Sequence, residues 1–388
     1  TEDYYTSGHL MKARGMKIRV EHPNWGNVPK EGFANQSNGC FAFRAAENSG
    51  FVVTLFAEAR LGTNQNLTLK GFKDGAAKAA DQITQWKVLL KPGGLPRRVY
   101  LQTESGDIAN LMAFGSFSAF WVDSHTAPGL PGPSSLSFVG QAFDHPNCTE
   151  ACKAGGALWF KPGSVTREKF GVAHEVGHWL HAQWTAAGPG PGGDPYAVSG
   201  SPALEPLCAY NTPGDGPGGH ALRSREHAHG AYTEGVGHFI AALAWNDPDQ
   251  TEGVFKYYKD SISNSSYDDM KNTAYVVSLE GAGAAPLGGT SDWFHQHCQV
   301  SAGQAVEIDW LRFLWDYRTN DPAEIDQSVP TNHDVFSLMQ FTKANHGWTS
   351  LGGVHNAYVA AFNNPALPQP AWFKPRWLTL AAQNGVAQ

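Results

Sequence analysis

The sequence has few cysteines, no long apolar run and no excess of basic residues. Five cysteines among 388 residues are too few, and odd in number, for a disulfide scaffold. Two disulfide bridges are possible, Cys148 with Cys152 and Cys208 with Cys298, and Cys40 would then have no partner. No stretch approaches the roughly 18 consecutive apolar residues of a membrane span, so we expect none. The net charge is −7, from 28 Lys and Arg against 35 Asp and Glu, without a basic run, and we expect no nucleic-acid partner.

The first residue and the composition favour an exported protein. The chain begins at Thr1 without an apolar leader, as a mature chain does after its leader has been removed. A charged fraction of 16%, with 43 Gly, 24 Pro and 13 Trp, also suits an exported protein. We therefore expect a secreted or periplasmic location. The sequence indicates no oligomeric state.

Short strands are predicted in the first ninety residues. Apolar or alternating runs separated by Gly, Asn and Pro indicate strands at 16–20, 40–43, 51–56, 67–69 and 86–90. Five such strands favour a small β-sandwich or barrel. The Lys-Pro-Gly-Gly segment at 91–94 is the most linker-like boundary. Because no catalytic side chains cluster before it, we interpret residues 1–94 as a β-rich accessory domain.

The remaining residues, 95–388, mix strands with helices and predict an α+β protein. We expect strands at 98–102, 137–143 and 156–160 and a helix at 107–121. The strand at 156–160 precedes the most informative helix and would offer its edge to an extended peptide. From residue 257 onward the pattern is mainly helical, with apolar periodicity clearest at 305–317, 335–343 and 354–362.

The segment HEVGH at 174–178 is the strongest chemical signal in the chain. On a helix His174 and His178 are four residues apart and lie on one face, where two imidazoles can bind one metal ion. Glu175 then lies beside that ion and can take a proton from the water that it activates. The helix itself is well supported, because apolar or small residues recur every three or four positions, at Phe170, Ala173, Gly177, Leu180 and Trp184.

A second helix, predicted at 224–245, offers a carboxylate in an apolar setting. Glu234 shares one stripe of this helix with small, aromatic and histidine side chains, among them Ala231, His238 and Ala241. An unpaired carboxylate would be costly to bury there, and a metal would remove that cost. Gly235 and Gly237 leave room for a close approach to the first helix, so the two helices are predicted to share a metal site.

The two segments together resemble the gluzincin metallopeptidases over residues 155–246. That family holds zinc with both His of H-E-x-x-H and with a Glu on a following helix, and here Glu234 stands 56 residues after His178. The resemblance implies that His174, His178 and Glu234 bind Zn²⁺, that Glu175 is the general base, and that residues 95–388 form a zincin-like catalytic domain. Many members have an Asp where this chain has His238. His238 is therefore a candidate to orient a ligand His, and a backbone carbonyl is the alternative.

Other third ligands remain open. A metzincin site would need His at position 184, where the chain has Trp184. The segment GTSD ending at Asp292 resembles the G-T-x-D element of aspzincins, but it lies more than a hundred residues downstream, far beyond the separation in that family. The further alternatives are His181, His227 and His229.

A zinc hydrolase also needs a donor for the developing oxyanion, usually His, Tyr or Arg. The candidates in the C-terminal half are Tyr275, His295, His297 and His333. Spacing does not choose among them.

Our expectation is a secreted zinc metallopeptidase that cleaves peptide or protein substrates. The alternatives are a zinc amidase acting on a non-peptide or cell-wall substrate, and a non-catalytic binding module with a structural zinc. Glu175 argues against the last, because a structural site needs no carboxylate beside an open coordination position.

Overall fold

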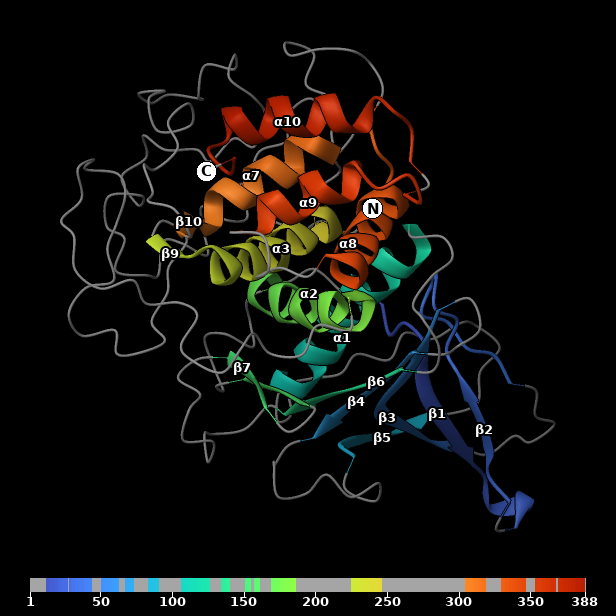
Figure 1. The fold of residues 1–388 in the computed structure, drawn as a ribbon. Helices are drawn as coiled ribbons and strands as arrows, with labels where there is room; N and C mark the ends of the chain where they lie inside the picture. The colour runs from blue at the N-terminus through green and yellow to red at the C-terminus, as the bar shows by residue number, and fades with distance from the viewer. Residues whose placement is uncertain are drawn as a thin grey trace, which may run out of the picture. The chain divides into compact units, whose positions relative to one another are not determined.

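The structure is a computed structural model whose class is α+β, with a sheet in the N-terminal part and helices in the C-terminal half. It describes residues 12–26, 28–43, 50–62, 67–72, 83–90, 106–125, 134–139, 151–154, 157–160, 169–185, 225–245, 304–318, 329–346, 353–367 and 369–387. The chain forms two compact units, residues 1–176 and 177–388. The division falls inside α2 (Lys169–Thr185), which is one continuous helix (Figure 1).

The first unit contains one mixed sheet. Its strands are β1 (Met16–Glu21), β2 (Lys30–Phe33), β3 (Phe51–Leu61), β4 (Leu67–Phe72), β5 (Gln85–Leu90), β6 (Ser134–Val139), β7 (Ala151–Ala154) and β8 (Ala157–Phe160). Their order is β2-β1-β3-β4-β6-β8-β7, and β5 also pairs with β3. The β4–β6 and β6–β8 pairs are parallel and the others antiparallel. β3 reaches two partners besides β1 because its eleven residues pair with β5 at one end and β4 at the other.

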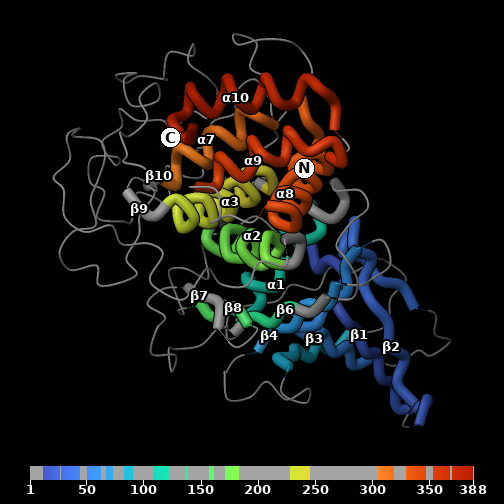
Figure 2. Tube along the Cα trace, viewed as in Figure 1, coloured from blue at the N-terminus to red at the C-terminus, as the bar shows by residue number. Residues whose placement is uncertain are grey.

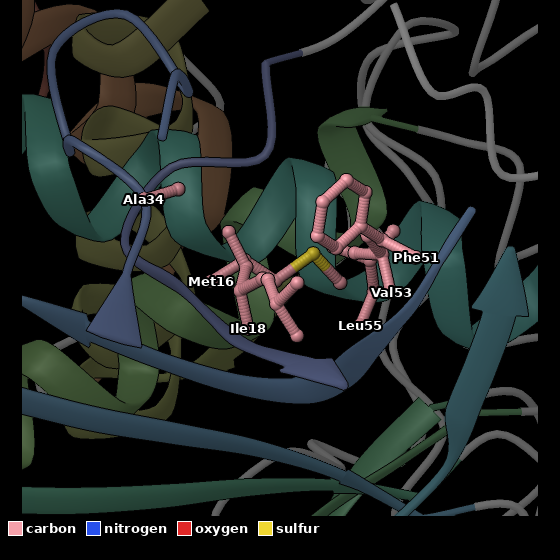
Figure 3. Packing of buried hydrophobic residues seen from close by; sticks show 7 residues of the cluster. Met16, Ile18, Ala34, Phe51, Val53 and Leu55 are labelled. Atoms are coloured by element: carbon pink, nitrogen blue, oxygen red, sulfur yellow. The ribbon is translucent and has the colours of Figure 1, made fainter. Parts of the chain in front are cut away.

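Alternation along β1 builds the core on one face of this sheet. Met16, Ile18 and Val20 are buried and alternate with partly exposed residues, as expected for a strand with one covered face. Figure 3 shows Met16 and Ile18 gathered with Phe51, Val53 and other members of this cluster. The short helix η1 (Pro23–Trp25) follows β1, and its Trp25 packs against the cluster.

Helix α1 (Gly106–His125) packs on β3, β4 and β6. Two glycines allow close contact: a Cβ at Gly71 of β4 would lie 2.8 Å from Ile108, and one at Gly115 of α1 would collide with Phe138. Arg14 ties the turn after β2 to this helix. Its guanidinium donates to the carbonyls of Gln36 and Ser37 at 2.8 Å and lies over two rings of α1, Phe117 and Phe120.

The second unit is helical around an aromatic core. Besides the end of α2 it contains α3 (Ala228–Trp245), α7 (Glu307–Arg318), α8 (Asn332–Asn345), α9 (Val354–Phe362) and α10 (Phe373–Gln383), with a two-stranded ribbon of β9 (Arg225–His227) and β10 (Gln304–Val306). α3 contacts α7 and α9, and Figure 2 traces it between α2 and α7. Trp310, Phe313, Tyr317, Tyr358 and Trp377 are almost fully buried and pack edge to face or tilted on one another.

Several sequence predictions are confirmed. Strands were expected within β1, β3, β4 and β5, and helices within α1, α2, α8 and α9. The helix expected at 305–317 is α7, but it begins at Glu307 because the two residues before it belong to β10. The residues that give the segment 305–317 its apolar periodicity are buried: Val306, Ile308, Trp310, Leu311, Leu314 and Trp315.

Other predictions are wrong. Residues 40–43 form no strand, and β2, which was not predicted, pairs with β1 instead. The strands form no separate sandwich or barrel, because the sheet continues through β6 to β8. The two compact units divide after Val176, and the domain boundary expected at residue 94 stays a prediction. β8 is not an edge strand, since β6 and β7 pair with its two sides. The helix expected from residue 224 begins at Ala228, because residues 225–227 pair with β10.

Some expectations fall outside the described residues. These include the strand at 98–102 and the side chains of Cys148, Cys152, Cys208 and Cys298, so both proposed bridges stay predictions. Cys40 is exposed and forms no disulfide. Among the helices that the structure describes, none combines the length and the apolar character needed to cross a membrane.

Candidate metal centre

Helix α2 places two imidazoles on one face. Val172, Ala173, Val176 and Leu180 are fully buried, which fixes the rotation of the helix about its axis. His174 and His178 follow one another by one turn on a neighbouring face. His174 is buried, and the side chain of His178 is 15% exposed. The spacing inferred from the sequence therefore holds in the structure.

Helix α3 brings a buried carboxylate to these imidazoles. Glu234 is 4% exposed and lies among fully buried neighbours such as Ala231 and Val236. One ligand atom from each of His174, His178 and Glu234 lies within 4.8 Å of the other two, and His178 Nε2 is 3.0 Å from Glu234 Oε2. Among the described residues this is the one group of three potential ligands that could hold a metal ion.

Two glycines allow α2 and α3 to approach. A Cβ atom at Gly177 would lie 2.9 Å from the carbonyl oxygen of Gly237 and 3.1 Å from Cβ of Ile240. The sequence predicted that both glycines of α3 allow the close approach to α2, but only Gly237 lies against α2. Gly235 instead faces α7, where an added Cβ would lie 3.0 Å from the carbonyl oxygen of Glu307.

The types of donor and the separation of one pair of donor atoms fit a tetrahedrally coordinated cation. Zinc binds imidazole nitrogen and carboxylate oxygen at about 2.0 to 2.1 Å, which places two tetrahedral ligands about 3.3 Å apart. The 3.0 Å between His178 Nε2 and Glu234 Oε2 is close to that value. Other divalent transition metals accept the same nitrogen and oxygen donors. The group could therefore hold a metal ion, and its geometry does not distinguish zinc from other divalent transition metals.

Glu175 follows His174 directly on α2 and is partly exposed. Glu175 is therefore more exposed than Glu234, which is buried. A partly exposed carboxylate next to a buried group of ligands is the arrangement that the sequence predicted for a base.

His238 lies one turn after Glu234 on α3. Its Nε2 is 3.1 Å from Oε2 of Glu307 on α7, and Glu307 is only 1% exposed. This partner was missed in the sequence, where residues 305–317 were interpreted as an apolar face. A glutamate in the first turn of a helix ordinarily indicates a favourable dipole interaction and gives no hint of burial.

Of the other proposed ligands, His181 and His229 are described and do not join the group. His181 is buried on α2 and packs edge-on against Tyr232, with ring centroids 5.5 Å apart. Burial and the charge of Lys343 lower the pKa of His229. His227 lies in β9, and its side chain, like all of Asp292, is outside the described part of the chain.

The oxyanion donor stays a prediction. His333 lies on α8, where its Nδ1 is 3.4 Å from Ser337 Oγ of the same helix. Tyr275, His295 and His297 lie outside the described residues.

Tyr232 is a second residue that the sequence analysis missed. It is fully buried two positions before Glu234, and its hydroxyl is 2.5 Å from the hydroxyl of Tyr358 on α9. Its ring also packs against Trp310 of α7. With its contact to His181 of α2, Tyr232 therefore connects α3 to three other helices, α2, α7 and α9. No spacing rule could have paired positions 232 and 358.

Comparison with known proteins adds no relative. No protein-family model matches the chain, and a search of curated proteins gives no significant match. The class of the site therefore has to be argued from its own residues.

Proposed function

We propose that the protein is a zinc-dependent hydrolase, and specifically a secreted metallopeptidase of the gluzincin type. The observation that carries the proposal is the group of His174, His178 and Glu234, whose ligand atoms lie within 4.8 Å of one another. When bound there, zinc would supply a Lewis acid that polarises a carbonyl group and makes water acidic enough to lose a proton near neutral pH.

The number of ligands supports a catalytic site. Catalytic zinc takes three protein ligands and keeps a position for water or substrate, whereas structural zinc takes four. In the part of the chain that the structure describes, no fourth His, Cys, Asp or Glu joins the group. A non-catalytic module would have no use for the carboxylate of Glu175 beside such a site.

Glu175 moves the proton in this proposal. Its carboxylate accepts a proton from the attacking water and then donates it to the nitrogen of the leaving amine, as a general base and then a general acid. His174, His178 and Glu234 hold their positions on two packed helices, so the reaction requires no rearrangement of the ligands.

The test compares the wild type with Glu175→Gln on a mixed peptide library, with and without a chelator. We expect chelator-sensitive cleavage by the wild type. Glu175→Gln should keep its metal, and its rate of cleavage should be lower by roughly 100-fold or more, because general-base catalysis raises the rate by about that factor. Glu58→Gln is the matched control, since Glu58 is also a partly exposed glutamate but pairs with Lys17 in the first unit.

Two results would contradict the proposal. Undiminished cleavage by Glu175→Gln would remove the assigned base. Metal binding without cleavage of any peptide would exclude a peptidase and leave the zinc amidase or the structural zinc as the function.

A further inference from the structure

The buried pair of His238 and Glu307 lies beside the metal-binding group, and nothing in the proposed reaction uses it. We propose that Glu307 is a positioning residue for the ligand Glu234, acting through His238. This inference rests on the proposed metal site, and it assigns a role to residues that do not touch the metal or a substrate.

α7 contacts α3 in the turn that follows Glu234. Gly235 comes directly after Glu234, and a Cβ added to it would lie 2.5 Å from Cβ of Trp310 and 3.0 Å from the carbonyl oxygen of Glu307. His238 is one turn after Glu234, and its Nε2 is 3.1 Å from Glu307 Oε2. The first turn of α7 therefore contacts α3 through its backbone and through a side chain within one turn of the ligand.

α3 needs such a contact because it contains glycine where it carries the ligand. Gly235 and Gly237 have no side chains to resist sliding or rotation, and glycine weakens a helix interior. A rotation of α3 by the angle between neighbouring residues would take the Glu234 carboxylate out of reach of His178. Apolar packing tolerates small shifts, whereas a hydrogen bond between two buried side chains holds only over a narrow range of distance and angle.

The burial of the pair also points to position rather than stability. Glu307 is 1% exposed and the side chain of His238 is 11% exposed, so both groups lose most of their hydration. Replacing a buried polar pair by apolar side chains of similar size is often neutral or stabilising. A pair kept in spite of that cost is best explained by the geometry that it fixes.

The same helix offers a matched control. Asp316, nine residues after Glu307 on α7, is 7% exposed and accepts a hydrogen bond of 2.8 Å from Nδ2 of Asn384, at the end of α10. It is therefore a buried carboxylate that joins α7 to another helix, as Glu307 does. Its partner helix carries no metal ligand.

The experiment measures the affinity for Zn²⁺ by competition with a chromophoric chelator, and the thermal unfolding of each metal-free protein. The variants are Glu307→Leu, Glu307→Gln, the double variant Glu307→Leu/His238→Phe, and the control Asp316→Leu. We expect Glu307→Leu and the double variant to lose affinity about tenfold, as is usual when a group that orients a ligand is removed. Glu307→Gln should stay within about threefold of the wild type, because its amide can still hydrogen-bond to His238.

The double variant separates position from stability. It replaces both partners by apolar groups, so it should unfold at a temperature no lower than the wild type and still bind Zn²⁺ more weakly. Asp316→Leu should unfold at a lower temperature and bind Zn²⁺ as the wild type does.

The inference is overturned if the double variant binds Zn²⁺ as tightly as the wild type, or if Asp316→Leu loses as much affinity as Glu307→Leu. Absence of Zn²⁺ binding by the wild type would overturn the metal site together with the inference. Because no outcome depends on hydrolysis, a failure of the proposed activity alone would leave this result standing.

Discussion

Gly177 on α2 lies directly against the backbone of Gly237 on α3, so that a Cβ atom at Gly177 would stand 2.9 Å from the Gly237 carbonyl oxygen. Real Cβ atoms essentially never approach other heavy atoms that closely. His178 and Glu234 are respectively the next residue after Gly177 and three residues before Gly237. The separation of the two ligands thus depends on the absence of a side chain at position 177.

Gly177→Ala should therefore weaken metal binding as well as the fold. The methyl group would push α2 and α3 apart, and overpacking of this kind costs about 1 to 3 kcal/mol of unfolding free energy. We expect the affinity for Zn²⁺ to fall about tenfold, because the ligands would separate with the helices. Urea unfolding of the metal-free protein and zinc competition measure the two effects.

Gly32→Ala is the control for that variant. A Cβ atom at Gly32 on β2 would meet nothing within 4 Å, so both measurements should match the wild type. If Gly177→Ala bound Zn²⁺ with unchanged affinity, the close contact of the glycines would not be what sets the ligand spacing.

The hydroxyl pair of Tyr232 and Tyr358 predicts coupled losses of stability. The two oxygens are 2.5 Å apart in a fully buried setting between α3 and α9. Tyr358→Phe and Tyr232→Phe should each lower the unfolding free energy by about 0.5 to 1.5 kcal/mol. The double variant should lose less than the sum of the two, because the second substitution breaks no further bond between them. Strictly additive losses in urea unfolding would show that this hydrogen bond contributes nothing.

His355 predicts a loss of stability in mild acid. Burial lowers the pKa of His355 below its ordinary value of 6.5. The indole N–H of Trp377 donates a hydrogen bond of 3.4 Å to Nδ1 of His355, and only the neutral imidazole can accept it. Because the folded pKa lies below the unfolded one, the contribution of the neutral ring is complete above about pH 6.5. It is lost as the pH falls from there through the folded pKa, since the unfolded chain then binds the extra proton.

Replacement of this histidine tests that origin. His355→Asn cannot be protonated, so its unfolding free energy should decline less steeply between pH 7 and pH 5 than that of the wild type, measured by urea titration at each pH. Tyr358→Phe serves as a destabilised control that keeps His355 and should retain the wild-type slope. An equal slope for His355→Asn and the wild type would place the acid sensitivity elsewhere.

The three residues of the group that could hold a metal ion were predictable because each has a local signature. His174 and His178 follow from helical spacing alone, and Glu234 follows from the cost of burying a carboxylate on an apolar helix. The partners of that site were not predictable in the same way. Glu307 reaches His238 across 69 positions of sequence. Nothing in the periodicity of α7 distinguishes a buried glutamate from one in a solvent-exposed first turn.

In the sheet, too, contacts between distant parts of the sequence were not predictable. Alternation within β1 and β3 was visible in the sequence because it is a property of each strand. The parallel pairing of β4 with β6 joins residues on either side of position 94, and the pattern of a single strand does not show such a pairing. β7 was not predicted, because its four residues, Ala151 to Ala154, are too few to show a period.

The zinc content of the purified protein shows whether the proposed metal site binds zinc. The wild type and Glu234→Ala would be equilibrated with zinc, dialysed against metal-free buffer and analysed by atomic emission, with circular dichroism to confirm that both are folded. We expect about one zinc per chain in the wild type, and a small fraction of that in Glu234→Ala, because loss of a ligand from a three-residue site greatly reduces affinity. No zinc in the wild type, or full occupancy in Glu234→Ala, would contradict the proposed metal site.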